Sequence, residues 1–314
     1  MSALLRIALA AVALAACGCA AARDDSRPAA AEGRVPVRRG PGTRLDAPAP
    51  RPERPAGSIE DAIPAGARRE TWFPKGPMLY EPYIAAPRQS RTAVKMQYPL
   101  GDGRNVKVEN TLGFQRSVLR WTSEEEPAEG TELEFEAAVF ARFDLHEKYD
   151  MDSSDWRFGI PLVHRDGDFA WKIHLYHMTS HLGDEYIDRT GAEQSPYHLE
   201  EAAFGLSWDA SAGSRLYGEA AAAIYTGEPT ESGRFQAGWE WVGGKWSSGF
   251  APYLAADVSV RKEQDWTPGT TLAVGVAYGR DFRFGLEYYN GRDPQTQFMH
   301  ERIRYLSVGL SMDL

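Results

Sequence analysis

The chain has 314 residues and a formal net charge of −9, with 44 acidic and 35 basic side chains. This acidic balance argues against nucleic acid as a partner, because the phosphate backbone attracts basic surfaces. The two cysteines, Cys17 and Cys19, both lie near the N-terminus, so the body of the protein contains no internal disulfide. Beyond the first 16 residues, no apolar run approaches the roughly 18 residues that indicate a membrane-spanning helix.

The N-terminus has the pattern of an export signal. A short basic start precedes an apolar run, Ile7 to Ala16, which suits a secretory signal and is too short to cross a bilayer as a helix. Leu14-Ala15-Ala16-Cys17 resembles a bacterial lipobox, which predicts lipidation of Cys17, while Ala20-Ala21-Ala22 offers a conventional cleavage site. We therefore assign residues 1–22 to a signal peptide and expect an exported protein.

Residues 23–70 are rich in Ala, Pro, Arg and Gly and show no hydrophobic periodicity. Few aromatic residues and many prolines are typical of a flexible, partly extended linker. We predict that this disordered segment lies in the periplasm and tethers a folded part that comprises residues 71–314.

From Thr92 onward, apolar and polar residues alternate with a period of two, which indicates β-strands with one apolar and one polar face. In one such stretch, Phe235, Ala237, Trp239 and Trp241 alternate with polar or small residues. The pattern predicts strands at 91–98, 105–121, 131–146, 155–165, 168–181, 197–209, 214–226, 233–243, 249–262, 268–279, 281–290 and 302–314.

These strands favour a membrane barrel over a soluble β-sandwich, which would alternate in the same way with its apolar face inward. Their lengths of about 10 to 14 residues match a tilted crossing of a bilayer, whereas strands in globular proteins average nearer five or six. The connections alternate between short turns and long loops, among them 147–154 and 182–196, as in outer-membrane barrels. We predict an all-β fold, an antiparallel transmembrane β-barrel of the outer-membrane type with about 12 strands.

The last strand supports this prediction. Leu306, Val308, Leu310, Met312 and Leu314 alternate with polar or small residues. The pattern resembles the C-terminal signal of bacterial outer-membrane barrels, although Met312 and Leu314 stand where Phe or Trp is usual. We expect this strand to engage the barrel-assembly machinery, and we expect outer-membrane lipid and lipopolysaccharide to surround the barrel.

Charges of both signs recur on the polar faces of the strands, which line the lumen of a barrel. They are Glu132, Glu134, Glu136, Arg142, Lys172, Arg215, Glu219, Arg234, Glu240, Arg261, Arg283 and Glu287. Such mixed signs predict cross-links that largely plug a narrow twelve-strand barrel, whereas a selective pore needs a stripe of one sign. The leading hypothesis is therefore a non-enzymatic barrel that is structural or narrowly permeable.

One stretch concentrates polar side chains: Tyr176-His177-Met178-Thr179-Ser180-His181-Leu182-Gly183-Asp184-Glu185-Tyr186. Together with Arg142-Phe143-Asp144-Leu145, with Gly285-Leu286-Glu287-Tyr288-Tyr289-Asn290-Gly291 and with the closing strand, it resembles the bacterial family of domain of unknown function 1207. Members of that family show a similar H-x-S-S-H-x-G-D-E motif, in which Thr179 takes the first Ser slot here. The resemblance covers roughly residues 75–314, and it implies an outer-membrane barrel with no known activity.

Alternation along strand 168–181 places His177, Thr179 and His181 on the face toward lipid, where polar groups are costly unless they are paired. Outer-membrane phospholipases and lipid A deacylases are similar, since they carry H-x-S on the outward face with a third polar residue from the neighbouring strand. Under this alternative hypothesis of a lipid acyl hydrolase, His177 is the general base and Thr179 the nucleophile.

Three further residues belong to this hypothesis. Glu193 or Glu185 would orient the imidazole of His177. Ser180 offers a second hydroxyl, but alternation points it into the barrel unless a bulge intervenes.

Two other interpretations of the polar stretch stay open. His177 and His181 are about 13 Å apart along a strand, too far to share a zinc ion unless the chain turns, in which case Asp184 and Glu185 would join as metal ligands. The segment Asp150 to Asp155 is rich in oxygen ligands and could hold Ca²⁺ in an outer loop. The structural alternative is that the polar side chains fasten the 182–196 loop to the barrel rim; no other cofactor is indicated.

Overall fold

The computed structural model describes residues 68–101, 105–123, 128–227, 233–279 and 281–314. The predicted signal peptide, Cys17 and most of the predicted linker lie outside the described residues. A short strand, β1 (Arg68–Trp72), begins within the range that was assigned to the linker.

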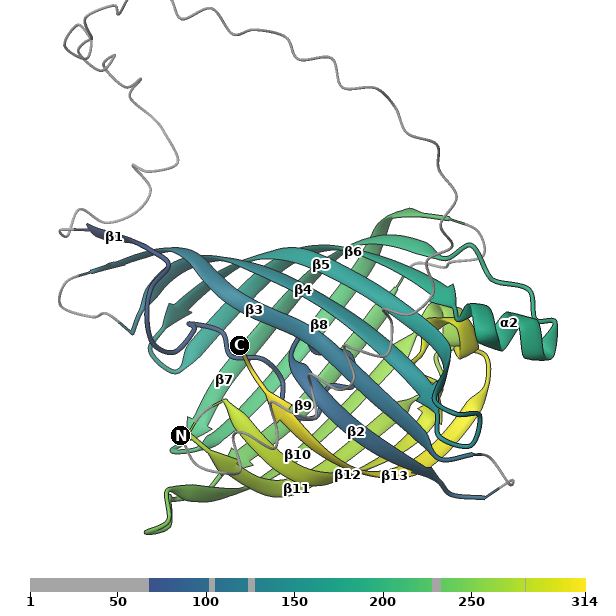
Figure 1. Cartoon of the computed structure of the whole chain (residues 1–314). Coiled ribbons are helices and arrows are strands. Elements are labelled where there is room, and N and C mark those ends of the chain that lie inside the picture. Colours follow the sequence, from purple (N-terminus) through teal and green to yellow (C-terminus); the bar gives the residue numbers. More distant parts are fainter. Residues whose placement is uncertain (1–67, 102–104, 124–127, 228–232, 280) are drawn as a thin grey trace, which may run out of the picture. The chain divides into compact units, whose positions relative to one another are not determined.

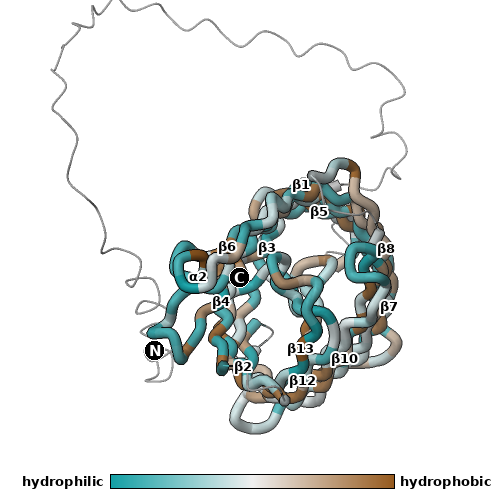
Figure 2. The backbone as a smooth tube through the Cα atoms, turned by 90° about the vertical axis from the view of Figure 1, so that its right-hand side faces the viewer, coloured by the Kyte–Doolittle hydropathy of each residue, from teal (hydrophilic) through white to brown (hydrophobic). Residues whose placement is uncertain are grey.

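Twelve antiparallel strands form a closed barrel (Figure 1), which confirms the predicted fold class. Consecutive strands pair along the chain, and β13 pairs with β2 to close the ring. Figure 2 shows these strands arranged as a ring around the lumen. They are β2 (Thr92–Pro99), β3 (Lys107–Ser123), β4 (Gly130–Asp144), β5 (Asp150–Asp166), β6 (Phe169–Leu182), β7 (His198–Ser211), β8 (Ser214–Thr226), β9 (Arg234–Val242), β10 (Phe250–Arg261), β11 (Gly269–Tyr278), β12 (Phe282–Arg292) and β13 (Arg302–Met312).

The two ends of the barrel differ in their connections. At one end, here called the turn end, the strands are joined by short links such as 167–168 and 212–213. The other end, here called the loop end, carries helix α2 (Asp184–Thr190) and the 3-10 turns η2 (Lys262–Gln264) and η3 (Thr296–Phe298). The predicted outer loop at 147–154 is wrong in part, because β5 already begins at Asp150.

The polarity of the strand faces is the reverse of that in a soluble sandwich, with apolar side chains outside and polar side chains inside. Large apolar side chains such as Leu175, Leu206 and Leu286 are exposed on the outer surface, while Glu132 and Glu134 are almost fully buried in the lumen. Exposed aromatic side chains gather toward both ends of the outer surface, as in the girdles of membrane barrels. They include Phe169, Trp208, Trp239 and Tyr278 toward the turn end, and Trp156, Tyr225, Phe235 and Trp266 toward the loop end.

Part of the segment between β1 and β2, residues 79–91, is largely buried inside the barrel, and we call it the plug. β1 pairs with the turn-end part of β3, at Leu119–Ser123, and the chain enters the lumen from there (Figure 1). The backbone N–H of Leu79 donates to Glu132 Oε2 at 3.0 Å. Tyr80 and Tyr83 are buried, and their hydroxyls are 2.6 Å apart.

Small inner side chains make room for the plug. Ile84 and Ala85 of the plug pack against Ala255, Ala273 and Ala277 on the inner faces of β10 and β11. The plug was not predicted from the sequence, because it has no periodicity and its partners lie far away along the chain.

At the loop end of the lumen, residues 293–299, which contain η3, fold inward. Arg142 Nη1 lies 2.7 Å from Asp293 Oδ2, and Thr296 donates to Asp155 Oδ2 from both its backbone N–H, at 3.0 Å, and its hydroxyl, at 2.9 Å. The plug and this segment therefore approach each other from opposite ends of the barrel.

Candidate functional site

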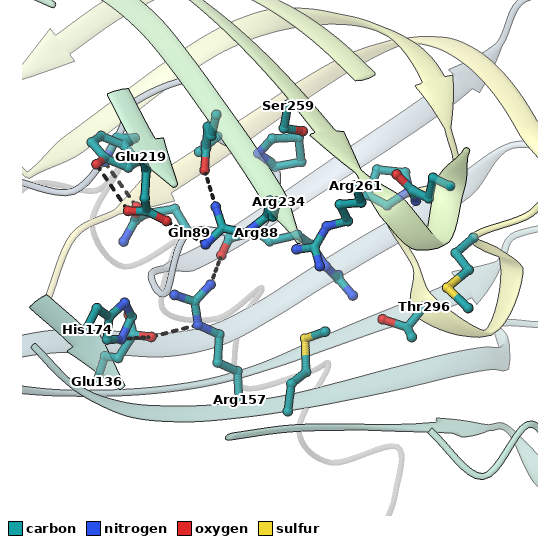
Figure 3. A pocket seen from close by; sticks show the side chains of 18 of the residues that line it. Arg88, Gln89, Glu136, Arg157, His174, Glu219, Arg234, Ser259, Arg261 and Thr296 are labelled. Atoms are coloured by element: carbon teal, nitrogen blue, oxygen red, sulfur yellow. Dashed lines mark hydrogen bonds and ion pairs between the residues drawn. The ribbon is translucent and has the colours of Figure 1, made fainter. Parts of the chain in front are cut away.

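The lumen of the barrel is largely filled. A cavity of about 70 Å³ lies between the plug and the segment that carries η3. Figure 3 shows the side chains around it, with Arg88 of the plug among cationic and acidic groups from several strands.

The charges around this cavity are bonded to one another rather than left for a ligand. Arg157 Nε donates to Glu136 Oε1 at 2.6 Å, and Arg157 Nη1 donates to the backbone carbonyl of Arg88 at 2.9 Å. Glu219 accepts both from Lys172, at 2.7 Å, and from Arg234, at 2.5 Å. These bonds are cross-links of the kind predicted from the mixed signs, and they fill the barrel.

The outer surface carries a second, different group of polar side chains, on β6 and β7. His177 points outward from β6, where its Nδ1 lies 2.7 Å from Glu200 Oε1 on β7. Its ring also stacks at a tilt on Phe158 of β5, with 4.9 Å between the ring centroids. The side chain of His177 is 24% exposed and that of Glu200 is 47% exposed, so the pair lies at the surface.

Thr179 follows His177 on the same outward face, two residues closer to the loop end. It is half-buried, and its hydroxyl forms no hydrogen bond within the part of the chain that the structure describes. The two Cα atoms are separated by about 7 Å along the strand, so both side chains can reach a reacting group that lies between them.

Aromatic residues fix the level of this cluster in the membrane. Thr179 pairs with Trp156 on β5, and Glu200 pairs with Tyr225 on β8. Both aromatic side chains belong to the loop-end girdle, and such girdles lie at the boundary between hydrocarbon and polar head groups. The His177–Thr179–Glu200 cluster therefore lies at the level of the loop-end girdle.

The remaining predicted site residues are elsewhere. Ser180 points into the barrel, where it is buried and donates to Asp155 Oδ1 at 2.5 Å. His181 is exposed, with its Nδ1 3.3 Å from Gln194 Nε2. Glu185 lies in α2, and Glu193 lies in the connection that follows it.

Glu200, rather than Glu185 or Glu193, is the carboxylate beside His177. Glu200 was not predicted, because the register between β6 and β7 is not visible in the sequence. The available signal was the alternation of β7, which puts Glu200 on the face toward lipid, where a carboxylate needs a partner.

The proposed metal ligands do not form a site in the described residues. Asp184 and Glu185 stand in the first turn of α2, and no three His, Cys, Asp or Glu side chains gather around a common point in the described part of the chain. The segment from Asp150 to Asp155 is strand rather than loop, and Asp152 bonds Lys107 at 2.7 Å.

None of the described helices is long and apolar enough to cross a membrane.

The closed barrel with an apolar outer face and a charged lumen is the architecture of outer-membrane β-barrel proteins. A structure of an active-site mutant of outer membrane phospholipase A from Escherichia coli matches with a TM-score of 0.51 and 10% identity over 74% of this chain and 93% of that one. The KdgM porin matches with a TM-score of 0.41 and 8% identity over 71% and 99% of the two chains, and the NanC porin with 0.44 and 12% over 71% and 100%. At 10% identity the phospholipase match shows the fold alone, and the two porin matches, with TM-scores below 0.5, add nothing to this conclusion.

The sequence itself identifies the family. A family model described as "Protein of unknown function (DUF1207)" matches residues 42–314, so the chain belongs to that family. The match begins within the predicted linker and covers the whole barrel. A comparison with curated proteins gives no match.

Proposed function

We propose that this barrel is a lipid acyl hydrolase that works on its outer surface. Thr179 is the nucleophile, His177 is the general base, and Glu200 orients His177. The observation that carries the proposal is the 2.7 Å contact between His177 Nδ1 and Glu200 Oε1 on the outward face, with the Thr179 hydroxyl on the same face. Polar groups on this face are costly, and stability alone does not account for two of them on β6 and a third on β7.

The chemistry follows from the positions of the two imidazole nitrogens. A hydrogen bond from Nδ1–H to Glu200 leaves Nε2 without a proton and able to accept one. As Thr179 Oγ1 attacks the ester carbonyl, Nε2 takes the hydroxyl proton, and Glu200 stabilises the imidazolium that forms. Nε2 then gives this proton to the alkoxide leaving group, which departs as an alcohol and leaves an acyl group on Thr179.

A water molecule completes the cycle. His177 takes a proton from the water, which attacks the acyl group, and the proton returns to Thr179 Oγ1 as the free fatty acid departs. The short turns of outer-membrane barrels face the periplasm, and with the turn end on that side this reaction takes place in the outer leaflet.

A second candidate is the structural barrel. The filled lumen favours it over a narrowly permeable one, since the cavity between plug and η3 is only about 70 Å³. Under this alternative, the His177–Glu200 pair does no more than fasten β6 to β7.

Ester hydrolysis by the purified protein in mixed micelles distinguishes the two candidates. We expect wild type to release fatty acid from lipid esters and Thr179→Ala to lower the rate by about 10²- to 10⁴-fold. Thr179→Ser should retain activity, because serine supplies the same hydroxyl with less steric hindrance. Ser180→Ala is the matched control, since the neighbouring hydroxyl points inward.

The folded state of each variant is checked by its resistance to SDS at room temperature. Folded wild type that releases no fatty acid, or a Thr179→Ala variant that is as fast as wild type, overturns the hydrolase and leaves the structural barrel. Lipid profiles of cells that express wild type or Thr179→Ala extend the same comparison to the native membrane.

A further inference from the structure

An open groove of about 940 Å³ runs over the outer surface of the barrel beside Thr179. Thr179 lines it directly, so the groove leads to the proposed nucleophile. Its floor is formed by small side chains, among them Ala137 and Val139 of β4. Larger apolar side chains that line the groove are Leu112, Phe114, Trp156, Phe158 and Leu314.

The groove is long enough for an acyl chain. It extends from β6 across β5 and β4 to β3, and on to Leu314, whose carbonyl accepts from Gln115 on β3. With neighbouring strands about 4.8 Å apart, these four steps span roughly 19 Å. One half of a bilayer core, which a single extended acyl chain spans, is about 15 Å thick. The groove can therefore hold the length of one chain.

The loop end of the groove is acidic. Asp184 and Glu185 of α2 line it there together with His181. Both carboxylates are exposed, and neither has an ion-pair partner within the described residues. Arg189 of the same helix is directed to Asp152, at 3.7 Å.

An amphiphile that fits this surface has an apolar chain for the floor and a cationic group for the acidic end. A zwitterionic glycerophospholipid with an amine in its head group has both. Lipid phosphates without such a cation would face two carboxylates, and like charges placed together oppose binding.

We propose that this groove binds one acyl chain of an amine-bearing zwitterionic glycerophospholipid, with its head group against Asp184 and Glu185 and its ester at Thr179. The assignment of this lipid as substrate rests on the proposed function, whereas its binding in the groove does not. The groove thereby selects the substrate by the charge of its head group.

The test offers full-length protein an equal mixture of phosphatidylethanolamine and phosphatidylglycerol with identical acyl chains in detergent micelles. Mass spectrometry measures released lysolipids, and native mass spectrometry measures the lipid that stays bound. We expect wild type to prefer phosphatidylethanolamine about three- to tenfold in both measurements, because two exposed charges contribute modestly. The double variant Asp184→Asn/Glu185→Gln should lose this preference, whereas Asp166→Asn/Asp168→Asn, with two exposed carboxylates at the turn end, should keep it.

A second variant tests the groove itself. Ala137→Trp fills the floor and should reduce bound lipid and hydrolysis of both lipids at least tenfold. Ala237→Trp adds the same side chain to the outer face of β9 and should change neither.

The outcomes separate this proposal from the hydrolase. Equal cleavage of both lipids by wild type, unchanged in the Asp184→Asn/Glu185→Gln variant, overturns the head-group selection and leaves the hydrolase intact. Retention of phosphatidylethanolamine by wild type and its loss in Ala137→Trp, without cleavage of either lipid, supports the groove and overturns the hydrolase. Binding that Ala137→Trp does not alter overturns the groove.

Discussion

Strand β6 carries a histidine–glutamate pair on each of its two faces, and the two pairs differ in what surrounds them. On the inner face, His174 Nε2 lies 3.0 Å from Glu136 Oε1, and the same oxygen accepts from Arg157 Nε at 2.6 Å. On the outer face, the Glu200 carboxylate bonds His177 and has no other hydrogen-bond or ion-pair partner among the described residues.

The inner pair belongs to a network in which carboxylates such as Glu136 and Glu219 each serve more than one donor. Such a network stabilises the barrel, because a buried charge is tolerated only when it is fully bonded. The outer pair is isolated, partly exposed and next to the free hydroxyl of Thr179. Residue type alone therefore does not distinguish a structural histidine–glutamate pair from a reactive one. The two kinds of pair are distinguished by the number of bonding partners and by the face of the strand on which they lie.

The largest expected effect separates the two histidines by activity. His177→Ala should lower ester hydrolysis by about 10²- to 10⁴-fold, because it removes the general base. His174→Ala should leave the rate within a few-fold of wild type, because Arg157 still satisfies Glu136 in the lumen. Rates of fatty acid release from the two folded variants check this prediction. An equal fall in the rate for both variants would contradict the proposal that only the outer histidine is catalytic.

The next effect is on stability and concerns the anchor between plug and wall. Arg215 donates to Glu240 Oε2 at 3.0 Å and to the plug carbonyls of Glu81 and Pro82 at 2.8 and 2.9 Å. Arg215→Ala leaves Glu240 buried without this partner, which costs on the order of 3–5 kcal/mol. We expect a lower temperature for the gel-mobility shift, with Arg304→Ala, an exposed outward arginine on β13, as the control.

Loosening of the plug adds a second readout to the Arg215→Ala variant. Wild type should conduct little in planar bilayers, and the variant should conduct more. A variant with unchanged melting and unchanged conductance would show that the plug does not depend on this anchor.

The barrel wall was predictable from the sequence and the plug was not. Each strand carries its own alternation, so Phe235 to Trp241 indicate a strand without knowledge of its neighbours. Tyr83 has no such local signal, because its partner Tyr217 lies far along the chain, with the two rings stacked at 3.8 Å.

The candidate site was predictable only on one strand. Alternation put His177 and Thr179 on the outward face, but Glu200 joins them through the pairing of β6 with β7. That pairing depends on the length of the 183–197 connection, in which α2 forms, whereas the prediction for 182–196 was a loop.

A smaller effect sharpens the role of Glu200 in the outer pair. Glu200→Gln keeps the shape of the side chain and a hydrogen-bond acceptor but removes the charge that stabilises the imidazolium. We expect hydrolysis to fall by about 10- to 100-fold, less than for His177→Ala, with little change in the apparent KM. Glu193→Gln is the matched control, since Glu193 lies in the connection after α2 rather than beside His177. A normal rate for Glu200→Gln would mean that the 2.7 Å contact orients nothing in catalysis.

The smallest expected effect lies at the loop end, where Glu263 of η2 is mostly buried. Burial raises the pKa of Glu263 above its usual 4.5, although Arg261, with Nη1 at 3.3 Å, and the Tyr197 hydroxyl act to lower it. A raised pKa in the folded state favours the protonated form. The stability that Glu263 contributes is therefore fully present below pH 4.5 and is lost as the pH rises through the folded pKa.

Glu263→Gln stays neutral at every pH and separates this residue from all other titrating groups. Thermal unfolding of wild type and variant should coincide near pH 4, and at pH 7 the variant should be the more stable of the two, because it does not bury a charge. A variant that is less stable than wild type at pH 7 would mean that the ion pair with Arg261 outweighs the cost of burying the charge. The loop end would then resemble the lumen, where ion pairs stabilise the barrel wall. It would differ from the outer face, where the charge of Glu200 serves the proposed catalysis.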